Sequence, residues 1–436
     1  MADKRYLHLN INMKAAGSHD GAWRHPHTDV SKINDFGALV EFARRAEAAK
    51  IDALFWADGL ALSTKSAAQS PHWAYEPLTL AGALTARTQR IGVIGTVSTT
   101  YTEPYNLARQ LASLDRISGG RVGWNVVTTG GTGEGAAANF GLEGHPVHEH
   151  RYRRAHEYID VIHALFDSWQ PGALVADQHS GVFVDATKVG PINHSGEFFR
   201  VAGPLNVQPA RPGDRPLLVQ AGGSEQGREL GAKYADLIYS ISQTIEDAKE
   251  YADDIRTRAQ GYGRDPDSIK ILTGFYVLVG QSVQHAKEKE QELLEFSDPS
   301  SVIKHVSGIT NLDLTKYPLD APLPETPAPT TVNGIQTHLA LLHQVIDRTH
   351  PTTLRELAAA LGGGVGAIGV ASDAAGVADT LQEWFESGVV DGFNIGIQQL
   401  QGGAEDFFDL VVPELTRRGL RPPDYLGTTL KDTFSA

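Results

Sequence analysis

Short runs of β-branched, aromatic and other apolar residues alternate along the chain with longer segments in which apolar residues recur every three or four positions. The first pattern is typical of buried strands and the second of amphipathic helices. The predicted strands are Tyr6–Asn12, Ala53–Ala57, Ile91–Val97, Arg121–Thr128, Pro216–Ala221, Asp236–Ser240, Lys270–Val279 and Asp391–Ile397. Eight strands separated by helices are typical of a parallel (β/α)8 barrel, which is the α/β fold class that we predict.

Three helices are the clearest in this pattern. They run through Phe36–Ala46, Leu107–Leu114 and Tyr152–Phe166. In each of them the apolar side chains fall on one face, which we expect to pack against the sheet.

Two long stretches, 170–215 and 296–366, interrupt the alternation of strands and helices. Glycine and proline are scattered through the first, and the second contains Pro322, Pro324, Pro327 and Pro329. Loops this long in a compact domain commonly have a function. We therefore predict one barrel domain over residues 1–436, with insertions after the fourth and seventh strands, the second insertion being a candidate lid.

The composition excludes several classes of partner and site. Acidic residues outnumber basic residues by 52 to 38, for a net charge of −14, whereas nucleic acids and anionic membranes are bound by clustered cations. The absence of cysteine excludes disulfides, thiolate metal sites and a cysteine nucleophile. The N-terminal segment lacks the apolar core of a signal peptide, and no stretch approaches 18 apolar residues. We expect a cytoplasmic protein.

Glycine-rich turns are the first candidates for ligand binding. Gly364–Gly369 and Gly131–Ala136 match the dinucleotide-binding spacing, but the first follows a predicted helix and the second is not expected to open one, so we predict no Rossmann site. Gln220–Arg228 directly follows a predicted strand and opens a helix. Free N–H groups at that helix end favour an anion near Ser224, although an ordinary N-cap explains a serine there equally well.

Histidines give a second signal. His145, His148 and His150 precede a helix and have the spacing of three metal ligands, but neighbouring arginines would repel a cation. A metal-dependent barrel hydrolase stays open as an alternative, while our own prediction includes no metal. His148 and Tyr152 are four residues apart, so their side chains share one helical face.

Polar residues also follow several predicted strands, where barrel enzymes carry their active sites. Asp58, Thr96 and Thr129 are such positions, together with Thr99 and Asn125. Individually each is explained as a cap or turn residue, but jointly they predict the mouth of a polar pocket. Four tryptophans near strand ends are candidates either for an apolar substrate wall or for the core, namely Trp23, Trp56, Trp73 and Trp124.

Several segments resemble a known family. They are Gly21–Pro26, Asp52–Gly59, Ser98–Tyr105, Gly119–Thr129, Asn139–Gly141 and Asp391–Asn394. Over almost the entire chain, these segments are similar to the bacterial-luciferase-like flavin monooxygenases, in the branch with nitrilotriacetate, dibenzothiophene-sulfone and long-chain-alkane monooxygenases. The resemblance implies a barrel that binds reduced FMN from a separate NAD(P)H-dependent reductase, uses O2 to oxygenate a small organic substrate, and assembles as a homodimer or homotetramer.

The resemblance also implies site residues. The positions that match flavin contacts of the family are Asp58, Thr96, Thr129, His148, Tyr152 and Ser224. Family members often carry a His or Cys in the loop after the first strand, which here makes His19 a candidate acid or base, and His305 corresponds to a lid histidine of some relatives. Solvent-exposed loop histidines are the competing interpretation. A deazaflavin-dependent oxidoreductase of the same superfamily is the alternative function.

Overall fold

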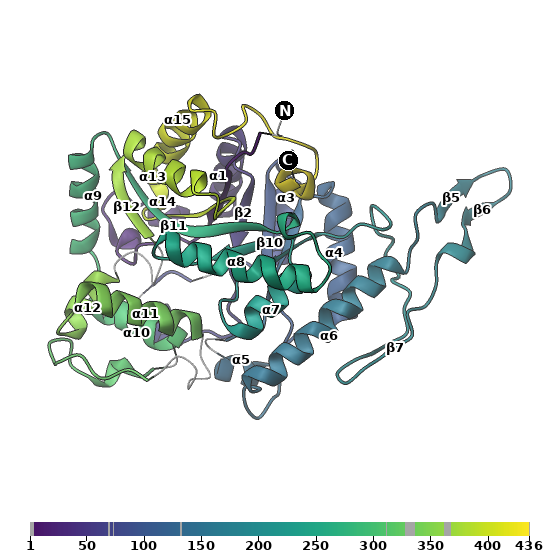
Figure 1. Ribbon diagram of the computed structural model, residues 1–436, viewed down its shortest axis with the longest axis horizontal. Coiled ribbons are helices and arrows are strands. Elements are labelled where there is room, and N and C mark those ends of the chain that lie inside the picture. Colours follow the sequence, from purple (N-terminus) through teal and green to yellow (C-terminus); the bar gives the residue numbers. More distant parts are fainter. Residues whose placement is uncertain are drawn as a thin grey trace.

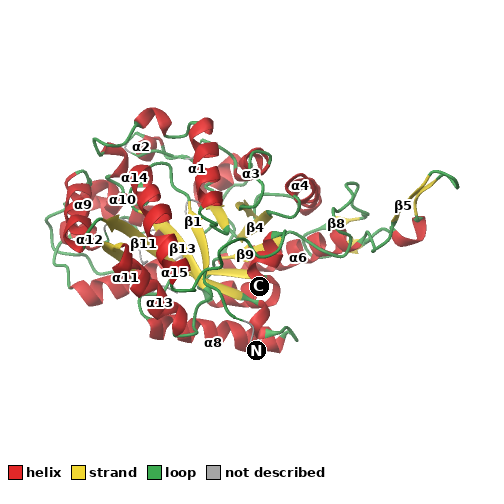
Figure 2. Ribbon diagram, turned by 90° about the horizontal axis from the view of Figure 1, so that it is seen from above, coloured by secondary structure: helices red, strands yellow, loops and turns green. Residues whose placement is uncertain are grey.

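The computed structural model describes residues 4–68, 70–72, 74–130, 133–310, 312–327, 336–361 and 368–435. At its centre eight parallel strands form a closed ring (Figures 1 and 2). In ring order they are β1 (His8–Asn12), β2 (Ala53–Trp56), β3 (Gly92–Ser98), β4 (Val122–Val127), β9 (Leu217–Gln220), β10 (Leu237–Ser240), β11 (Lys270–Gly280) and β13 (Gly392–Ile397). The predicted (β/α)8 barrel is confirmed, and no predicted strand boundary is wrong by more than two residues.

One strand was missed. β12 (Ile368–Asp373) pairs in parallel with the second half of β11, from Phe275 to Gly280, and lies outside the ring. β11 is 11 residues long, so it extends beyond its barrel neighbours and leaves an edge that β12 covers.

Alternate residues of the strands point into the barrel. The lower interior is apolar, with Phe55, Ile94, Val219 and Leu272 buried together. The C-terminal helix α16 (Leu430–Ser435) adds Leu430 to this cluster and closes the barrel at the end where the strands begin. The opposite end, where the strands finish, is therefore the open mouth, as in other barrels.

Amphipathic helices surround the ring, and the main core lies between their apolar faces and the outer faces of the strands. They include α1 (Phe36–Ala48), α3 (Pro77–Thr85), α4 (Pro104–Ser118), α6 (His148–Asp167), α7 (Glu225–Tyr234), α8 (Ile245–Gly261), α9 (Val283–Glu295), α13 (Ala374–Glu386), α14 (Leu400–Asp406) and α15 (Val412–Arg417). The three helices predicted from spacing are α1, α4 and α6, and all are confirmed. In the described part of the chain, no helix is long and apolar enough to cross a bilayer.

The two insertions differ in form. The first is an arm that projects from the barrel, built from the short strands β5 (Leu174–Asp177), β6 (Val182–Val184), β7 (His194–Ser195) and β8 (Arg200–Val201) (Figures 1 and 2). The second, which the sequence suggested to be loop-like, contains α10 (Pro299–Thr310), α11 (Gln336–Thr349) and α12 (Leu354–Ala360). These three helices bury residues such as Val306, Leu342 and Leu357 in a hydrophobic cluster separate from the main core. We call them the helical insertion.

The helical insertion is attached at its root to the loop that follows β1. The hydroxyl of Ser297 donates to both carboxylate oxygens of Asp20, at 2.9 and 2.8 Å, and the N–H of Asp298 donates to the same carboxylate at 3.2 Å. Arg24 also donates to the carbonyl of Phe296, at 3.0 Å. The insertion therefore begins beside the barrel mouth.

Candidate active site

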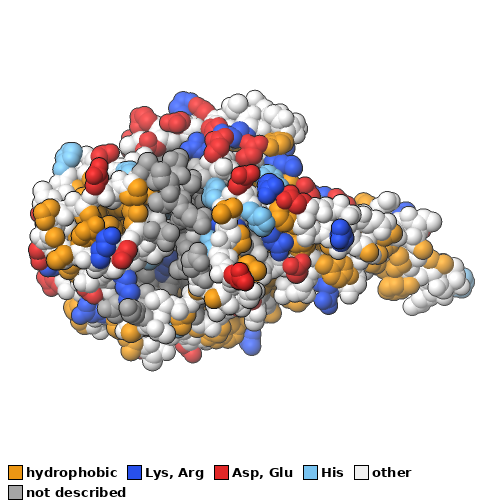
Figure 3. All heavy atoms as spheres, turned by 90° about the horizontal axis from the view of Figure 1, so that it is seen from below, with side chains coloured by type: hydrophobic (Ala, Val, Ile, Leu, Met, Phe, Trp, Pro, Cys, Tyr) orange, Lys and Arg blue, Asp and Glu red, His pale blue; other side chains and the backbone are white. Residues whose placement is uncertain are grey.

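The predicted site residues lie at the mouth end of the barrel, on the side of the molecule where α5 (Gly133–Asn139), α10 and α11 are seen in Figure 1. Figure 3 shows this face, which is hollowed near its middle and has histidine side chains beside the hollow.

Hydrogen bonds connect the polar residues at the ends of β3 and β4. The hydroxyl of buried Thr96 donates to the carbonyl of Trp56 at 2.8 Å and accepts from the Asn125 amide at 2.8 Å. The hydroxyl of Thr129 donates to that of Ser98 at 2.6 Å. Thr129 has φ +52°, a conformation that is costly for a β-branched side chain and that is often found at functional sites.

The N-terminus of α7 continues this wall, because β9, the strand that precedes it, lies next to β4 in the ring. Ser224 is its N-cap, and its hydroxyl accepts from the N–H of Gly227 at 3.2 Å. The Tyr152 hydroxyl of α6 lies 3.5 Å from the Ser224 hydroxyl, and the His148 ring is centred 4.7 Å from the Tyr152 ring. The structure thus brings three of the predicted cofactor residues together, His148 and Tyr152 from α6 and Ser224 from the start of α7.

The turn between β9 and α7 has room only for glycine at one position. A Cβ atom on Gly222 would lie 2.8 Å from the Cα of Gly227, so the turn packs directly against the helix. Tyr251 donates to the Gly222 carbonyl at 3.2 Å, and Arg228 donates to the Gly223 carbonyl at 3.1 Å. These contacts hold the turn in place, leaving helix N–H groups and two hydroxyls available to an anion such as a phosphate.

Asp58 lies alone after β2. Its half-buried carboxylate accepts from the N–H of Gly59 at 2.8 Å. Burial raises the pKa of Asp58, the Gly59 N–H bond lowers it, and the charge of Glu76 raises it further. No hydrogen bond joins Asp58 to another predicted cofactor residue in the described part of the chain.

His19 is buried, with 4% of its surface exposed, so it is not a solvent-exposed loop histidine. Its Nδ1 accepts from the N–H of Gly21 at 3.1 Å, which places the proton of the neutral ring on Nε2. Burial lowers the pKa of His19 and favours this neutral form, against the charge of Asp20, which raises it. Nε2 is buried without a hydrogen-bond partner among the described residues. His19 therefore presents an unused N–H donor.

His305 lies on α10 of the helical insertion and is exposed to solvent, as the competing interpretation expected. However, the surrounding protein and the charge of Lys14 lower its pKa to about 4, against the opposing charge of Asp20. Lys14 follows β1, so the structure brings His305 to the same side of the mouth as the loop that carries His19.

The histidine triad suggested as a metal site separates in the structure. Nδ1 of His145 lies 2.6 Å from the hydroxyl of Tyr101, the His148 ring is tilted against that of Tyr152, and the His150 ring packs edge-on against Phe198. Among the described residues, no group of three or more His, Asp or Glu side chains could hold a metal ion.

Of the two interpretations given for the tryptophans, Trp124 follows the core one: it is 2% exposed and packs against Tyr158 in the core outside the barrel. Gly133 begins α5, contrary to the expectation that no helix opens there. Even so, the closed barrel has no crevice between two halves of an open sheet, which a Rossmann site requires. Gly131, Trp73 and most of the Gly364–Gly369 segment lie outside the described residues.

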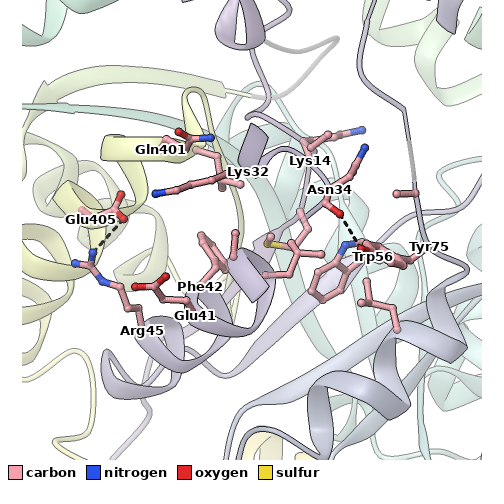
Figure 4. A pocket seen from close by; sticks show the side chains of 17 residues that line it. Lys14, Lys32, Asn34, Glu41, Phe42, Arg45, Trp56, Tyr75, Gln401 and Glu405 are labelled. Carbon is pink, nitrogen blue, oxygen red and sulfur yellow. Dashed lines mark hydrogen bonds and ion pairs between the residues drawn. The ribbon is translucent and has the colours of Figure 1, made fainter. Parts of the chain in front are cut away.

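A cavity of about 220 Å³ lies between the barrel wall and α1, and Lys14 in the loop after β1 is one of the residues that line it (Figure 4). Its lining includes Trp56 and Phe42, with Lys32, Arg45 and Glu405 around it, and Arg45 pairs with Glu405 at 3.0 Å. Trp56, proposed as a substrate wall, therefore faces this outer cavity and the core, because outward residues of β2 pack against α1.

Sequence reasoning missed Lys14, Asp20 and His338 as residues of the mouth. Burial lowers the pKa of His338, on α11, to about 4, and the charges of His305 and Lys14 act in the same direction. A signal for Asp20 and Lys14 existed, because both lie in the loop after the first strand, where barrel enzymes carry site residues. His338 gives none, since it stands in an ordinary amphipathic helix.

Comparisons with known proteins identify the family of the chain. The sequence model of the luciferase-like monooxygenase family matches residues 16–391. The chain is 37% identical over 434 residues to N-acetyl-S-(2-succino)cysteine monooxygenase of Bacillus subtilis (strain 168), covering 99% of this chain and 97% of that protein. It is 36% identical over 444 residues to nitrilotriacetate monooxygenase component A of Aminobacter aminovorans, with coverage of 99% and 97%. A crystal structure of riboflavin lyase with modified FMN and riboflavin superposes with a TM-score of 0.88 at 30% identity, covering 99% and 96%.

Proposed function

Because the chain belongs to the luciferase-like monooxygenase family, we propose that it is the oxygenase component of a two-component, FMN-dependent system. In this proposal a separate NAD(P)H-dependent reductase supplies reduced FMN, and the protein inserts one atom of O2 into a small organic substrate. The relatives named above act on different organic compounds, so family membership leaves the substrate of this chain open.

The anion site at α7 is the observation that carries the proposal. A flavin mononucleotide ends in a phosphate, and the N-terminus of α7 with Ser224 and Tyr152 fits such a group in charge and in hydrogen-bonding capacity. His148 extends this wall along α6. Asp58, Thr96 and Thr129 are proposed to contact the rest of the cofactor from β2, β3 and β4, whose ends share the same mouth.

The residues of this chain are proposed to position the reactants, to donate a proton and to keep water out. Reduced FMN, when bound, supplies the two electrons that activate O2. The Nε2–H of His19 is directed to a hydrogen-bond acceptor that the described protein does not provide, so it is suited to donate to oxygen or to the substrate at the mouth. The helical insertion is proposed to act as a lid, with His305 on its inner side, that keeps bulk water from the reaction.

Anaerobic titration of the purified protein with photoreduced FMN tests this function. We expect saturable binding of reduced FMN, followed on admission of O2 by a rapid-mixing absorbance transient and by incorporation of ¹⁸O from labelled O2 into an accepted substrate. Absence of reduced FMN binding would refute the proposal. Binding of a deazaflavin in its place would instead favour hydride transfer without O2.

Self-association is part of the proposal. Phe183 is 68% exposed on the projecting arm, and neighbouring Leu174, Val175 and Val182 are exposed as well. Figure 3 shows hydrophobic side chains along this arm. A two-stranded ribbon is marginally stable alone, and exposed apolar patches commonly mark interfaces, so we propose that the arm packs against a second copy in a homodimer or homotetramer. We also propose a cytoplasmic location, where NAD(P)H is available to the reductase.

A further inference from the structure

The loop after β1 carries His19, and the barrel fixes one side of this loop. The N–H of His19 donates to the carbonyl of Gln398, directly after β13, at 3.0 Å, and the N–H of Ser18 donates to the carbonyl of Ile397 at 2.8 Å. A Cβ atom on Gly17 would overlap with the Gln398 carbonyl oxygen, so the two segments are in direct contact. The backbone of His19 is therefore held from the side of β13.

The other side of the same loop contacts the root of the helical insertion, where α9 ends and α10 begins. The carboxylate of Asp20 accepts from the Ser297 hydroxyl at 2.9 and 2.8 Å and from the N–H of Asp298 at 3.2 Å. A Cβ atom on Gly21 would overlap with the carbonyl oxygen of Leu293 and would lie 3.1 Å from the backbone nitrogen of Ser297. The two residues that directly follow His19 thus depend on the insertion for their position.

Both of these residues also act on the imidazole of His19. The N–H of Gly21 donates to Nδ1 at 3.1 Å, and a carboxylate oxygen of Asp20 lies 3.7 Å from the same nitrogen. The charge of Asp20 raises the pKa of His19 against the larger effect of burial. A shift of Asp20 would therefore change the position of His19 and also the charge beside its ring.

Asp20 is the central contact between the loop and the insertion. Two further contacts join the same segments: Arg24 donates to the carbonyl of Phe296 at 3.0 Å, and Nε2 of His25 lies 3.6 Å from the Glu292 carboxylate. The Glu292 side chain is 58% exposed and that of Asp20 only 23%, so water competes less at Asp20. Hydrogen bonds to a carboxylate are stronger than those between neutral groups.

We propose that Asp20 is a positioning residue, which holds the Nε2–H of His19 toward the mouth while the root of the helical insertion is docked on the loop. The inference rests on the proposed function, in which His19 donates a proton and the insertion excludes water. It adds that one contact assembles both features. A lid that completes the catalytic arrangement as it closes brings the acid into place only when water is kept out.

The test measures how accessible His19 is in the full chain without flavin. Diethyl pyrocarbonate modifies unprotonated imidazoles, and peptide mass spectrometry gives the rate at each histidine. His19 should react slowly in the unmodified protein, because its side chain is 2% exposed. Asp20→Asn removes the charge, and Ser297→Ala removes the hydroxyl on the other side of the contact. We expect each to raise the rate at His19 about tenfold or more, because bonds to a charged group are lost.

Ser301→Ala is the matched control. The hydroxyl of Ser301 also donates to a carboxylate at 2.9 Å, but this carboxylate belongs to Asp298, so the bond stays within the insertion. The variant loosens the root without touching Asp20, and His19 should react as slowly as in the unmodified protein. His179, exposed on the projecting arm, corrects for differences in reagent between samples.

Two results would overturn the inference. If His19 reacts equally slowly in Asp20→Asn and Ser297→Ala, the barrel alone holds it. If Ser301→Ala raises the rate as much as Ser297→Ala, general loosening of the insertion explains the effect and Asp20 has no special part. Circular dichroism shows which variants are folded, and variants on both sides of the contact keep the test decisive if one is not. Failure of the proposed function appears instead as loss of reduced FMN binding in the unmodified protein, which the modification rate does not measure.

Discussion

Ser224→Ala removes one hydroxyl that has two tasks in the proposed site. As the N-cap of α7 it accepts from the N–H of Gly227 at 3.2 Å, and it lies 3.5 Å from the Tyr152 hydroxyl, facing the proposed phosphate position. The two tasks differ in size. Loss of an N-cap costs about 1 kcal/mol of folding stability, whereas loss of a hydrogen bond to a charged group costs about 1.5–3 kcal/mol of binding.

These magnitudes predict separate outcomes. About 1 kcal/mol lowers the Tm of a chain of this length by about 2 °C or less. A loss of about 1.5–3 kcal/mol weakens binding of reduced FMN roughly 10- to 150-fold. Anaerobic fluorescence titration measures the second quantity, and differential scanning calorimetry the first.

Ser282→Ala provides the control, because Ser282 is the N-cap of α9 and also accepts from a backbone N–H, that of His285, at 3.2 Å. We expect this variant to lose similar stability and to keep the affinity for reduced FMN. If Ser224→Ala and Ser282→Ala bind reduced FMN equally well, Ser224 is a structural cap and the phosphate assignment is wrong.

Three further predictions test other parts of the structure. His19→Asn keeps an acceptor for the N–H of Gly21 but removes the Nε2–H. We expect the rate of product formation in steady-state assays to fall roughly 10²- to 10⁴-fold while reduced FMN still binds. Unchanged turnover would exclude His19 from the chemistry. Arg421→Met removes the charged partner that lies 2.6 Å from buried Asp52 and leaves the carboxylate with His8 and the N–H of Leu9, so the free energy of unfolding should fall by up to about 3–5 kcal/mol in urea denaturation. Burial raises the pKa of Asp52, but the charge of Arg421 and further bonds hold this pKa below its usual range. The stabilisation from the ion pair is therefore complete at neutral pH and is lost as the pH falls through the lowered pKa. The difference in stability between Arg421→Met and the unmodified protein should shrink in acid, and a constant difference would contradict the pairing. Phe183→Asp should reduce the mass in light scattering to that of one chain, and an unchanged mass would place the interface elsewhere.

The barrel was predictable because each of its strands is buried on both faces. Gly92–Ser98 is buried at every position, so its sequence is a short apolar run bounded by turns. The arm and the helical insertion were not predictable in form, for different physical reasons. The strands of the arm are exposed, as Leu174–Asp177 shows, and carry no burial pattern. The helices of the insertion pack on one another, so their short apolar faces do not follow the alternation of the barrel.

The site was predictable to the extent that strand ends define it. Thr96, Asp58 and Thr129 follow directly from the rule that barrel enzymes carry their site residues where strands finish. Tyr152 and Ser224 follow from helix geometry and the resemblance to known proteins. His338 could not be predicted, because its position at the mouth depends on how α11 folds back over the barrel, and spacing within one helix does not contain that information.

Ring order relates the proposed phosphate site to the proposed acid. Ser224 follows β9 and His19 follows β1, and in the closed ring these strands are separated by three others in either direction. A flavin held by its phosphate at α7 is thus proposed to extend across the mouth toward the loop that carries His19, whose Nε2 is buried without a partner among the described residues. Fixing the cofactor at one end in this way lowers the entropic cost of bringing the reactants together, so Ser224→Ala should lower turnover even at concentrations of reduced FMN that saturate the variant.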